Sequence, residues 1–126
     1  MAVVLDASAL LAYLLGEPGA EVLDGLLADA RMASVNWAEV VQKSLSAGVN
    51  VDGMLEDLQA LGMRIEPFLP ADGERAGRLW PLTRRQGLSL ADRACLSLGL
   101  RLGLKVVTCD QAWAQLPIEL EIHLLR

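Results

Sequence analysis

The stretch Ala2–Leu15, AVVLDASALLAYLL, introduces the pattern that the rest of the chain repeats. It opens with a short β-branched run that predicts a strand, and this run ends at Asp6. Ser8–Leu15 then predicts a helix, with Ser8 as a candidate N-cap. A buried strand that leads directly into a helix is typical of α/β proteins, in which residues just after the strands lie at the binding edge of the sheet.

The same alternation continues to the C-terminus. Further strands are predicted at Met32–Val35, Arg64–Pro67, Lys105–Thr108 and Ile118–Leu124. Further helices are predicted at Glu21–Ala30, Trp37–Ala47, Asp52–Leu61, Asp72–Gln86, Ser89–Leu102 and Asp110–Gln115. Asn36 is the predicted cap of the helix that it precedes, and Pro81 should kink or break the helix that contains it. We therefore expect an α/β fold, a parallel sheet with helices on both faces.

Length and composition are those of one globular domain spanning residues 1–126. Of the 126 residues, 53% are hydrophobic and 21% are charged, and the mean hydropathy is +0.36. This apolar content rules out a disordered chain. No apolar run reaches the roughly 18 residues of a membrane span, and the N-terminus lacks the basic leader of a signal peptide. A cytoplasmic location and no membrane partner are therefore expected.

Few residues are available for thiol or imidazole chemistry. Cys95 and Cys109 lie in apolar stretches without CxxC or Cys/His spacing, so we expect both to be buried free thiols. With His123 as the single histidine, a Ser-His-Asp triad or a multi-histidine zinc site would need residues that the chain hardly has. Chemistry in this protein should therefore depend mainly on carboxylates.

Charge is distributed unevenly along the chain. The net charge of −5 argues at first sight against a polyanionic partner. Residues 73–105 nevertheless carry a local charge of +5. Their basic residues are Arg75, Arg78, Arg84, Arg85, Arg93, Arg101 and Lys105. This stretch is compatible with phosphate binding, and a solvated arginine face explains it equally well.

Three acidic residues are candidates for a site, although each has an ordinary structural explanation. Asp6 and Asp110 directly follow predicted strands, where an aspartate can bond turn amides or cap the next helix. Glu39 can close a capping box with Asn36, and it can also pair with Lys43 four residues later. Taken singly, none of the three establishes a site.

Asp92 is a stronger candidate. In the predicted helix Ser89–Leu102, Arg93, Ser97 and Arg101 recur every fourth residue and define a stripe expected to face solvent. Asp92 lies about 140° from the centre of that stripe, on the apolar side of the helix. A carboxylate facing a core needs a cation or hydrogen-bond donors, so we favour a bound metal over a helix-start aspartate bonded to nearby amides.

Together, these acids predict a metal site in the crevice where the winding of the sheet reverses. Carboxylates packed there would raise one another's pKa unless cations neutralised them. Hard oxygen ligands favour Mg²⁺, with Mn²⁺ as a substitute. Two such ions about 3.5–4 Å apart can orient a water and stabilise an in-line phosphodiester displacement.

The candidate acids lie in four short motifs. They are Val3–Leu14 (VVLDASALLAYL), Asn36–Val40 (NWAEV), Leu88–Cys95 (LSLADRAC) and Val107–Ala114 (VTCDQAWA). In this order and spacing, and across essentially the whole chain, they resemble the motifs of PIN-domain nucleases, especially VapC-type toxins of prokaryotic toxin–antitoxin pairs. The resemblance implies a PIN-like α/β/α sandwich with a central parallel sheet, and a metal-dependent endoribonuclease.

The resemblance also implies roles for individual residues. It assigns the acidic metal-binding site to Asp6, Glu39, Asp92 and Asp110. It implies that Ser8 and Thr108 help to hold the metal or its waters, and that Asn36 is a small polar residue beside the acids. Arg93 is either a phosphate contact or a solvent-facing residue.

Partners are implied in the same way. The resemblance implies an RNA substrate cleaved by a metal-activated water to leave a 5′-phosphate and a 3′-hydroxyl, a homodimer, and a VapB-like antitoxin whose tail occupies the acidic groove. Tyr13, Leu14 and the apolar positions of residues 22–61 are candidates for those surfaces, and core packing explains them equally well. A non-catalytic PIN-fold module that binds RNA or protein is the alternative.

Overall fold

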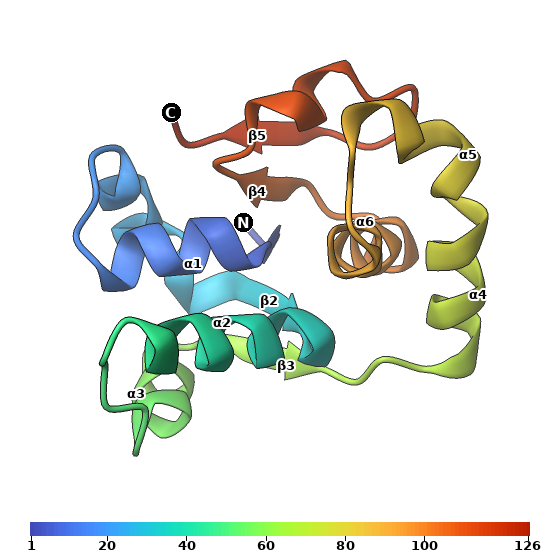
Figure 1. Ribbon diagram of the computed structural model, residues 1–126. Helices are drawn as coiled ribbons and strands as arrows, with labels where there is room; N and C mark the ends of the chain where they lie inside the picture. Colours follow the sequence, from blue (N-terminus) through green and yellow to red (C-terminus); the bar gives the residue numbers. More distant parts are fainter.

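A five-stranded sheet forms the centre of the computed structural model, which describes residues 1–126 (Figure 1). The strands are β1 (Val3–Leu5), β2 (Ala30–Ala33), β3 (Arg64–Glu66), β4 (Val106–Thr108) and β5 (Ile122–Leu124). Every neighbouring pair is parallel, and the order across the sheet is β3-β2-β1-β4-β5. The central strand is β1, whose three residues are fully buried.

The strand order places the change in winding direction beside β1. The chain passes from β1 outward to β2 and β3, and then returns to form β4 on the other side of β1. Leu5 pairs with Val107, so β1 and β4 end side by side. Ligand sites of open parallel sheets lie outside the carboxyl ends of the strands at such a point. The geometry of the sheet therefore directs attention to the residues that follow β1 and β4.

Helices cover both faces of the sheet. The α-helices are α1 (Ala7–Leu14), α2 (Ser34–Ser46), α3 (Met54–Ala60), α4 (Pro70–Arg78), α5 (Trp80–Thr83) and α6 (Leu90–Leu102). The 3₁₀ segments are η1 (Ala20–Gly25), η2 (Leu27–Asp29), η3 (Arg84–Gln86) and η4 (Gln111–Gln115). None of these helices combines the length and the apolar content that crossing a membrane would require.

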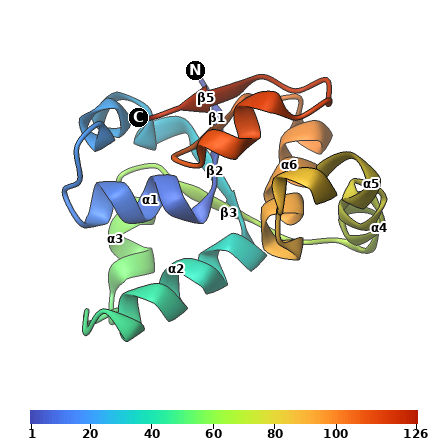
Figure 2. The ribbon, with the colours of Figure 1, turned by 45° about the horizontal axis from the view of Figure 1, so that its top comes forward.

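The alternation of side chains along β1 separates two cores. Val3 and Leu5 pack with α1, α2 and α3 on one face, whereas Val4 packs with α6 on the other. Helix α6 lies between the sheet and α4 (Figures 1 and 2). The α/β/α sandwich with a parallel sheet that the sequence predicted is thereby confirmed.

Several predicted boundaries are wrong. The predicted helix Glu21–Ala30 is two 3₁₀ segments, which follow Gly19 in a left-handed conformation without a side-chain cap. Strand β2 begins at Ala30 rather than Met32, because Ala30 pairs with Val3. The predicted strand Ile118–Leu124 shortens to β5, because β4 offers only three residues for pairing.

The break expected at Pro81 is confirmed. Helix α4 ends at Arg78, and α5 starts again at Trp80 with Pro81 in its first turn. A proline in the first turn loses nothing by lacking an N–H, whereas inside a continuous helix it would clash with the preceding turn. The break redirects the chain, so α5 and η3 leave the line of α4 (Figure 2).

The stripe of α6 that was predicted to face solvent is instead covered by α4. Ser97 is fully buried, and its hydroxyl donates to the carbonyl oxygen of Asp72 at 2.9 Å. The buried carboxylate of Asp72 accepts from the Leu69 N–H at 2.8 Å and pairs with Arg75 at 3.0 Å and Arg101 at 2.9 Å. The polar spacing on α6 therefore serves a contact between helices rather than a solvated face.

Helix α6 also packs closely on β4 at Gly99. A Cβ at this position would lie 2.6 Å from Val106 Cγ2 and 3.2 Å from Leu120 Cδ2. Gly99→Ala is therefore expected to destabilise the fold by about 1–3 kcal/mol through overpacking. Gly77→Ala is a matched control, because a Cβ on this exposed residue of α4 meets nothing within 4 Å. It should stabilise the fold by about 0.5–1 kcal/mol, so urea midpoints that move in the same direction for both variants would contradict this packing.

Candidate metal-binding active site

A cleft of about 380 Å³ brings the four predicted acids together at the carboxyl edge of the sheet. It is lined by Asp6, Ala7, Ser8, Glu39, Lys43, Ser89, Asp92 and Asp110. Asp6 follows β1, Glu39 comes from α2, Asp92 from the first turn of α6, and Asp110 precedes η4. Residues from four separate parts of the chain therefore meet at the point where the winding reverses.

Asp6 is the buried acid of the cleft, with 4% of its surface exposed. It is the N-cap of α1, because its Oδ1 accepts from the Ala9 N–H at 2.8 Å, and the prediction that Ser8 caps this helix is wrong. Ser8 Oγ instead donates to the Asp6 carboxylate at 2.8 Å, and Thr108 Oγ1 donates to it at 2.5 Å. These donors hold the carboxylate in a fixed position at the end of β1.

Burial raises the pKa of Asp6 from 3.8 to about 6. The hydrogen bonds from Thr108, Ala9 and Ser8 oppose this rise, and the negative charge of Asp92 adds to it. The sequence predicted that neighbouring acids would raise one another's pKa. For Asp6 the direction is the predicted one, but the main cause is removal from water.

The two hydroxyls of the site join β4 to α1. The Cys109 N–H donates to Ser8 Oγ at 2.9 Å, and the Asp110 N–H donates to Thr108 Oγ1 at 3.0 Å. The two hydroxyl oxygens lie 3.3 Å apart. Ser8 and Thr108 therefore lie beside Asp6 as the resemblance implied, and a role in holding the waters of a metal remains a prediction.

Asn36 orients Glu39. Its buried side-chain Nδ2 donates to Glu39 Oε1 and to the Ala91 carbonyl oxygen, both at 2.9 Å, so one amide also joins α2 to α6. The predicted capping box is wrong, because Ala33 is the N-cap and Asn36 lies inside the first turn of α2. The predicted ion pair between Glu39 and Lys43 is not formed either, although Lys43 lines the same cleft.

Asp92 and Asp110 are held by backbone amides. Asp92 Oδ2 accepts from the Ser89 N–H at 2.9 Å, and Ser89 Oγ accepts from the Asp92 N–H at 3.1 Å, which completes a capping box. The spacing Ser-x-x-Asp could have predicted this box from the sequence. Asp110 caps η4 by accepting from the Ala112 N–H at 3.0 Å. The ordinary structural roles considered for these two acids are therefore real.

Those structural roles nevertheless leave part of each carboxylate free. Glu39, Asp92 and Asp110 each use one oxygen to accept a hydrogen bond, and the second oxygen of each has no donor within the protein. Burial raises the pKa of the Cys95 thiol well above its usual value, and the charges of Asp6, Asp92 and Glu39 raise it further. The charges of Asp6, Asp92 and Glu39 therefore all reach the same buried thiol.

This set of donors fits a hydrated hard cation better than a cage formed by protein alone. No three His, Cys, Asp or Glu side chains lie close enough to hold one ion together in this arrangement. Mg²⁺ commonly keeps several waters and binds through one or two carboxylates, and the free oxygens around a cleft of about 380 Å³ suit that mode. The cleft offers neither imidazole nor thiolate, the ligands typical of Zn²⁺.

The predicted site residues and the lining of the cleft are not the same set, because Asn36, Thr108 and Arg93 do not line it and Ala7, Lys43 and Ser89 were not predicted. Lys43 and Ser89 line the cleft, although the sequence indicated neither as a site residue. Arg93 does not line it, and its Nη1 donates to the Ala76 carbonyl oxygen of α4 at 3.4 Å. A phosphate contact by Arg93 remains a prediction that this arrangement does not favour.

Comparison with known proteins extends this description. The PIN domain family model matches residues 3–119. A search of curated proteins gives no match. Similar solved structures include FitAcB from Neisseria gonorrhoeae, with 18% identity, a TM-score of 0.72, and coverage of 98% of this chain and 97% of that one. Another is VapC20 from Mycobacterium tuberculosis, described as a sarcin-ricin loop cleaving toxin, with 13% identity, a TM-score of 0.73, and coverage of 95% and 99%.

A third similar structure is VapBC2 from Rickettsia felis bound to a DNA fragment from its promoter. It has 18% identity and a TM-score of 0.69, and the match covers 97% of each chain. At these identities the three structures show a shared fold. Because the family model spans nearly all of the sequence, including the motifs that converge on the cleft, the chain belongs to the PIN domain family.

Proposed function

We propose that this protein is a metal-dependent endoribonuclease that hydrolyses RNA phosphodiester bonds with Mg²⁺, or with Mn²⁺ as a substitute. The observation that carries this proposal is the convergence of Asp6, Glu39, Asp92 and Asp110 on one cleft, where three of them keep an oxygen free of protein donors. The description of VapC20 as a sarcin-ricin loop cleaving toxin supports RNA as the substrate class.

The residues of the cleft would hold the cation through oxygens that the fold has already positioned. Asp6 is fixed by Ser8 and Thr108, and with a pKa of about 6 it is mostly ionised above neutral pH. When bound, Mg²⁺ would supply positive charge that lowers the pKa of a water and stabilises the oxygens of the scissile phosphate. Lys43 adds a positive charge at the wall of the cleft, where it can attract a phosphate.

We further propose that the protein is the toxin of a VapBC-type pair, acts as a homodimer and binds a VapB-like antitoxin. The fold that it shares with VapC20, which is described as a toxin, and with the VapBC2 structure supports this assignment. Tyr13 and Leu14, which were candidates for these surfaces, pack against the core. Val22 and Leu45, which belong to the candidate range 22–61, are exposed apolar residues, as is Leu15, and these three are better candidates for contact with a partner.

The test is cleavage of structured and unstructured RNAs as Mg²⁺ or Mn²⁺ is titrated into the wild type, Asp92→Asn and Asp52→Asn. Asn at position 92 can still accept the capping bond from Ser89, so the fold should persist while the free carboxylate oxygen is lost. We expect cleavage that needs the metal and falls about 10²-fold to 10³-fold in Asp92→Asn, since a metal supplies several kcal/mol of transition-state stabilisation. Asp52 is exposed, lies outside the cleft and has no ion-pair partner, so Asp52→Asn should cleave normally.

Tight RNA binding without cleavage, unchanged by metal and by Asp92→Asn, would contradict the proposal. That outcome would favour the alternative of a non-catalytic PIN-fold binding module. Far-UV circular dichroism of each variant separates a loss of chemistry from a loss of structure.

A further inference from the structure

Most of the cations in the basic stretch 73–105 have partners within the protein. Arg75 and Arg101 pair with Asp72, Arg78 pairs with Glu74, Lys105 lies 3.8 Å from Glu121, and Arg93 donates to a carbonyl oxygen of α4. Arg84 and Arg85 have no acidic partner. The structure thus reduces a stretch of charge +5 to two arginines that remain available to an external anion.

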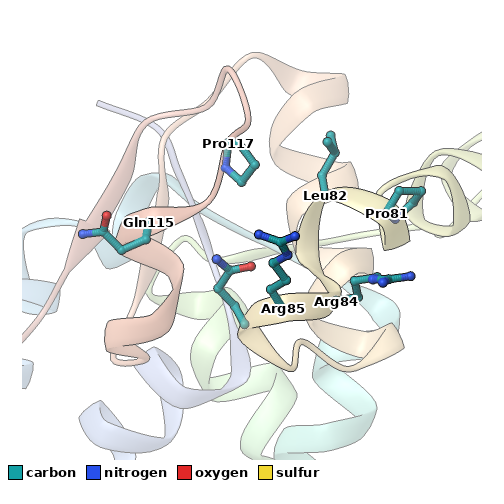
Figure 3. A pocket seen from close by; sticks show the side chains of 7 residues that line it. Pro81, Leu82, Arg84, Arg85, Gln115 and Pro117 are labelled. Atoms are coloured by element: carbon teal, nitrogen blue, oxygen red, sulfur yellow. The ribbon is translucent and has the colours of Figure 1, made fainter.

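These two arginines line a cavity of about 500 Å³ between η3 and the end of η4 (Figure 3). Its lining residues are Pro81, Leu82, Arg84, Arg85, Gln86, Gln115 and Pro117, which include no acid. Arg85 extends into the space between Gln115 and the turn that carries Leu82, whereas Arg84 points the other way. The guanidinium of Arg84 lies 5.1 Å from the centre of the Trp80 ring, a cation–π contact. Arg85 is therefore the unpaired cation inside the cavity.

Both walls of the cavity are joined by short stretches of chain to residues of the acidic cleft. On one side, Gln86 lies three residues before Ser89, which lines the cleft. On the other, η4 starts directly after Asp110 and ends at Gln115, a span of about 10 Å at about 2 Å per residue of 3₁₀ helix. A single extended nucleic-acid strand can thus contact both the cavity and the cleft.

We propose that the Arg85 cavity binds a backbone phosphate of the RNA strand, next to the phosphate held in the acidic cleft. This inference rests on the proposed function. A protein of net charge −5 needs unpaired cations close to the cleft in order to hold a polyanion, and Arg85 is one. The planar guanidinium matches the geometry of phosphate oxygens, and Gln86 adds a side-chain amide to the lining of the same cavity.

The test measures binding of a fluorescein-labelled oligouridylate by anisotropy in an Asp6→Asn background, where hydrolysis is blocked. Arg85→Gln should raise Kd about threefold to tenfold near 0.1 M salt and lower the slope of log Kd against log salt by about 0.7. Arg64→Gln is the matched control, because Arg64 is exposed at the start of β3, on the opposite edge of the sheet from the cleft. Its Kd should equal that of the parent.

Equal effects of Arg85→Gln and Arg64→Gln, or no binding of the oligouridylate by the parent, would overturn the inference. Polyglutamate, a model of an acidic protein segment, is the second probe. If Arg85→Gln lost polyglutamate binding but kept its RNA binding, the inference would also be overturned, and the cavity would be assigned to an acidic protein segment. Because binding is measured without hydrolysis, failure of the wild type to cleave RNA would refute the proposed function alone. Normal wild-type cleavage with unchanged RNA binding in Arg85→Gln would refute only the cavity.

Discussion

Asp6→Asn is expected to stabilise the metal-free protein at pH 8 while reducing RNA cleavage about 10³-fold. The buried carboxylate has its pKa raised from 3.8 to about 6, which corresponds to a penalty of about 3 kcal/mol when it is ionised. Asparagine removes this charge and can still accept from Ala9, while its amide is compatible with neighbouring hydroxyls. A net gain of about 2 kcal/mol is therefore expected in the free energy of unfolding.

The sign of the pH dependence follows from the same shift. Because the folded state binds the Asp6 proton more tightly than the unfolded state, the wild type loses stability as pH rises from about 4 to about 6, and the penalty remains above that range. Urea unfolding in EDTA at pH 5 and pH 8 measures this loss as a difference from Asp6→Asn. Asp52→Asn should follow the wild type. A wild type that is more stable than Asp6→Asn at pH 8 without metal would contradict this account of the site.

Asp72→Asn is expected to destabilise the fold by about 3 kcal/mol, or to lower Tm by about 10 °C. The carboxylate is 1% exposed, whereas the side chains of its partners Arg75 and Arg101 are 34% and 26% exposed. Its removal leaves two partly buried guanidiniums without a counterion and loosens α4 from α6. The exposed pair of Glu74 with Arg78 is the matched control, and Glu74→Gln should cost less than about 1 kcal/mol.

The Asp72 contribution should disappear in acid. Burial raises the pKa of Asp72, but the Leu69 N–H, Arg75 and Arg101 outweigh it and hold the pKa below its usual value. Its stabilising effect is therefore present above the unfolded pKa near 3.8 and is lost as pH falls through the lower folded value. Thermal melts of wild type and Asp72→Asn between pH 7 and pH 2 should converge. A constant difference across that range would show that the ion pairs are not its source.

The sequence predicted the sheet and the four acids because both depend on short-range patterns. Strands such as Val3–Leu5 are continuous apolar runs, and parallel strands bring the residues that follow them to one edge of the sheet. Asp6 and Asp110 lie near each other on that edge because β1 and β4 are also neighbours. Asp92 lines the cleft, but the helical period that placed it on the core side of α6 assumed a solvent-facing stripe that α4 covers, and its capping box with Ser89 was missed. Local spacing was sufficient to predict the strand-to-helix units and the acids that follow their strands.

Contacts between distant polar residues were not predictable in this way. Periodicity assigns Ser97 and Arg101 to solvent because they are polar, and only the docking of α4 shows that Asp72 covers them. Asn36 was expected at a helix cap, whereas its side chain joins α2 to α6 inside the protein. The sequence predicted a break in the helix at Pro81. It did not predict the direction that the chain takes after the break, and the Arg85 cavity depends on that direction.

The most direct test of the central claim is the anomalous scattering of Mn²⁺ in crystals grown with the ion. We expect a Mn²⁺ peak in the cleft, ligated by one or two of the acids and otherwise by waters that bridge to the remaining carboxylates, and its loss in crystals of Asp6→Asn. The oxygens of Glu39, Asp92 and Asp110 that have no protein donor are the candidates for these direct and water-mediated contacts. A cleft without a peak at saturating Mn²⁺, or an unchanged peak in Asp6→Asn, would contradict the assignment of this site to a divalent metal.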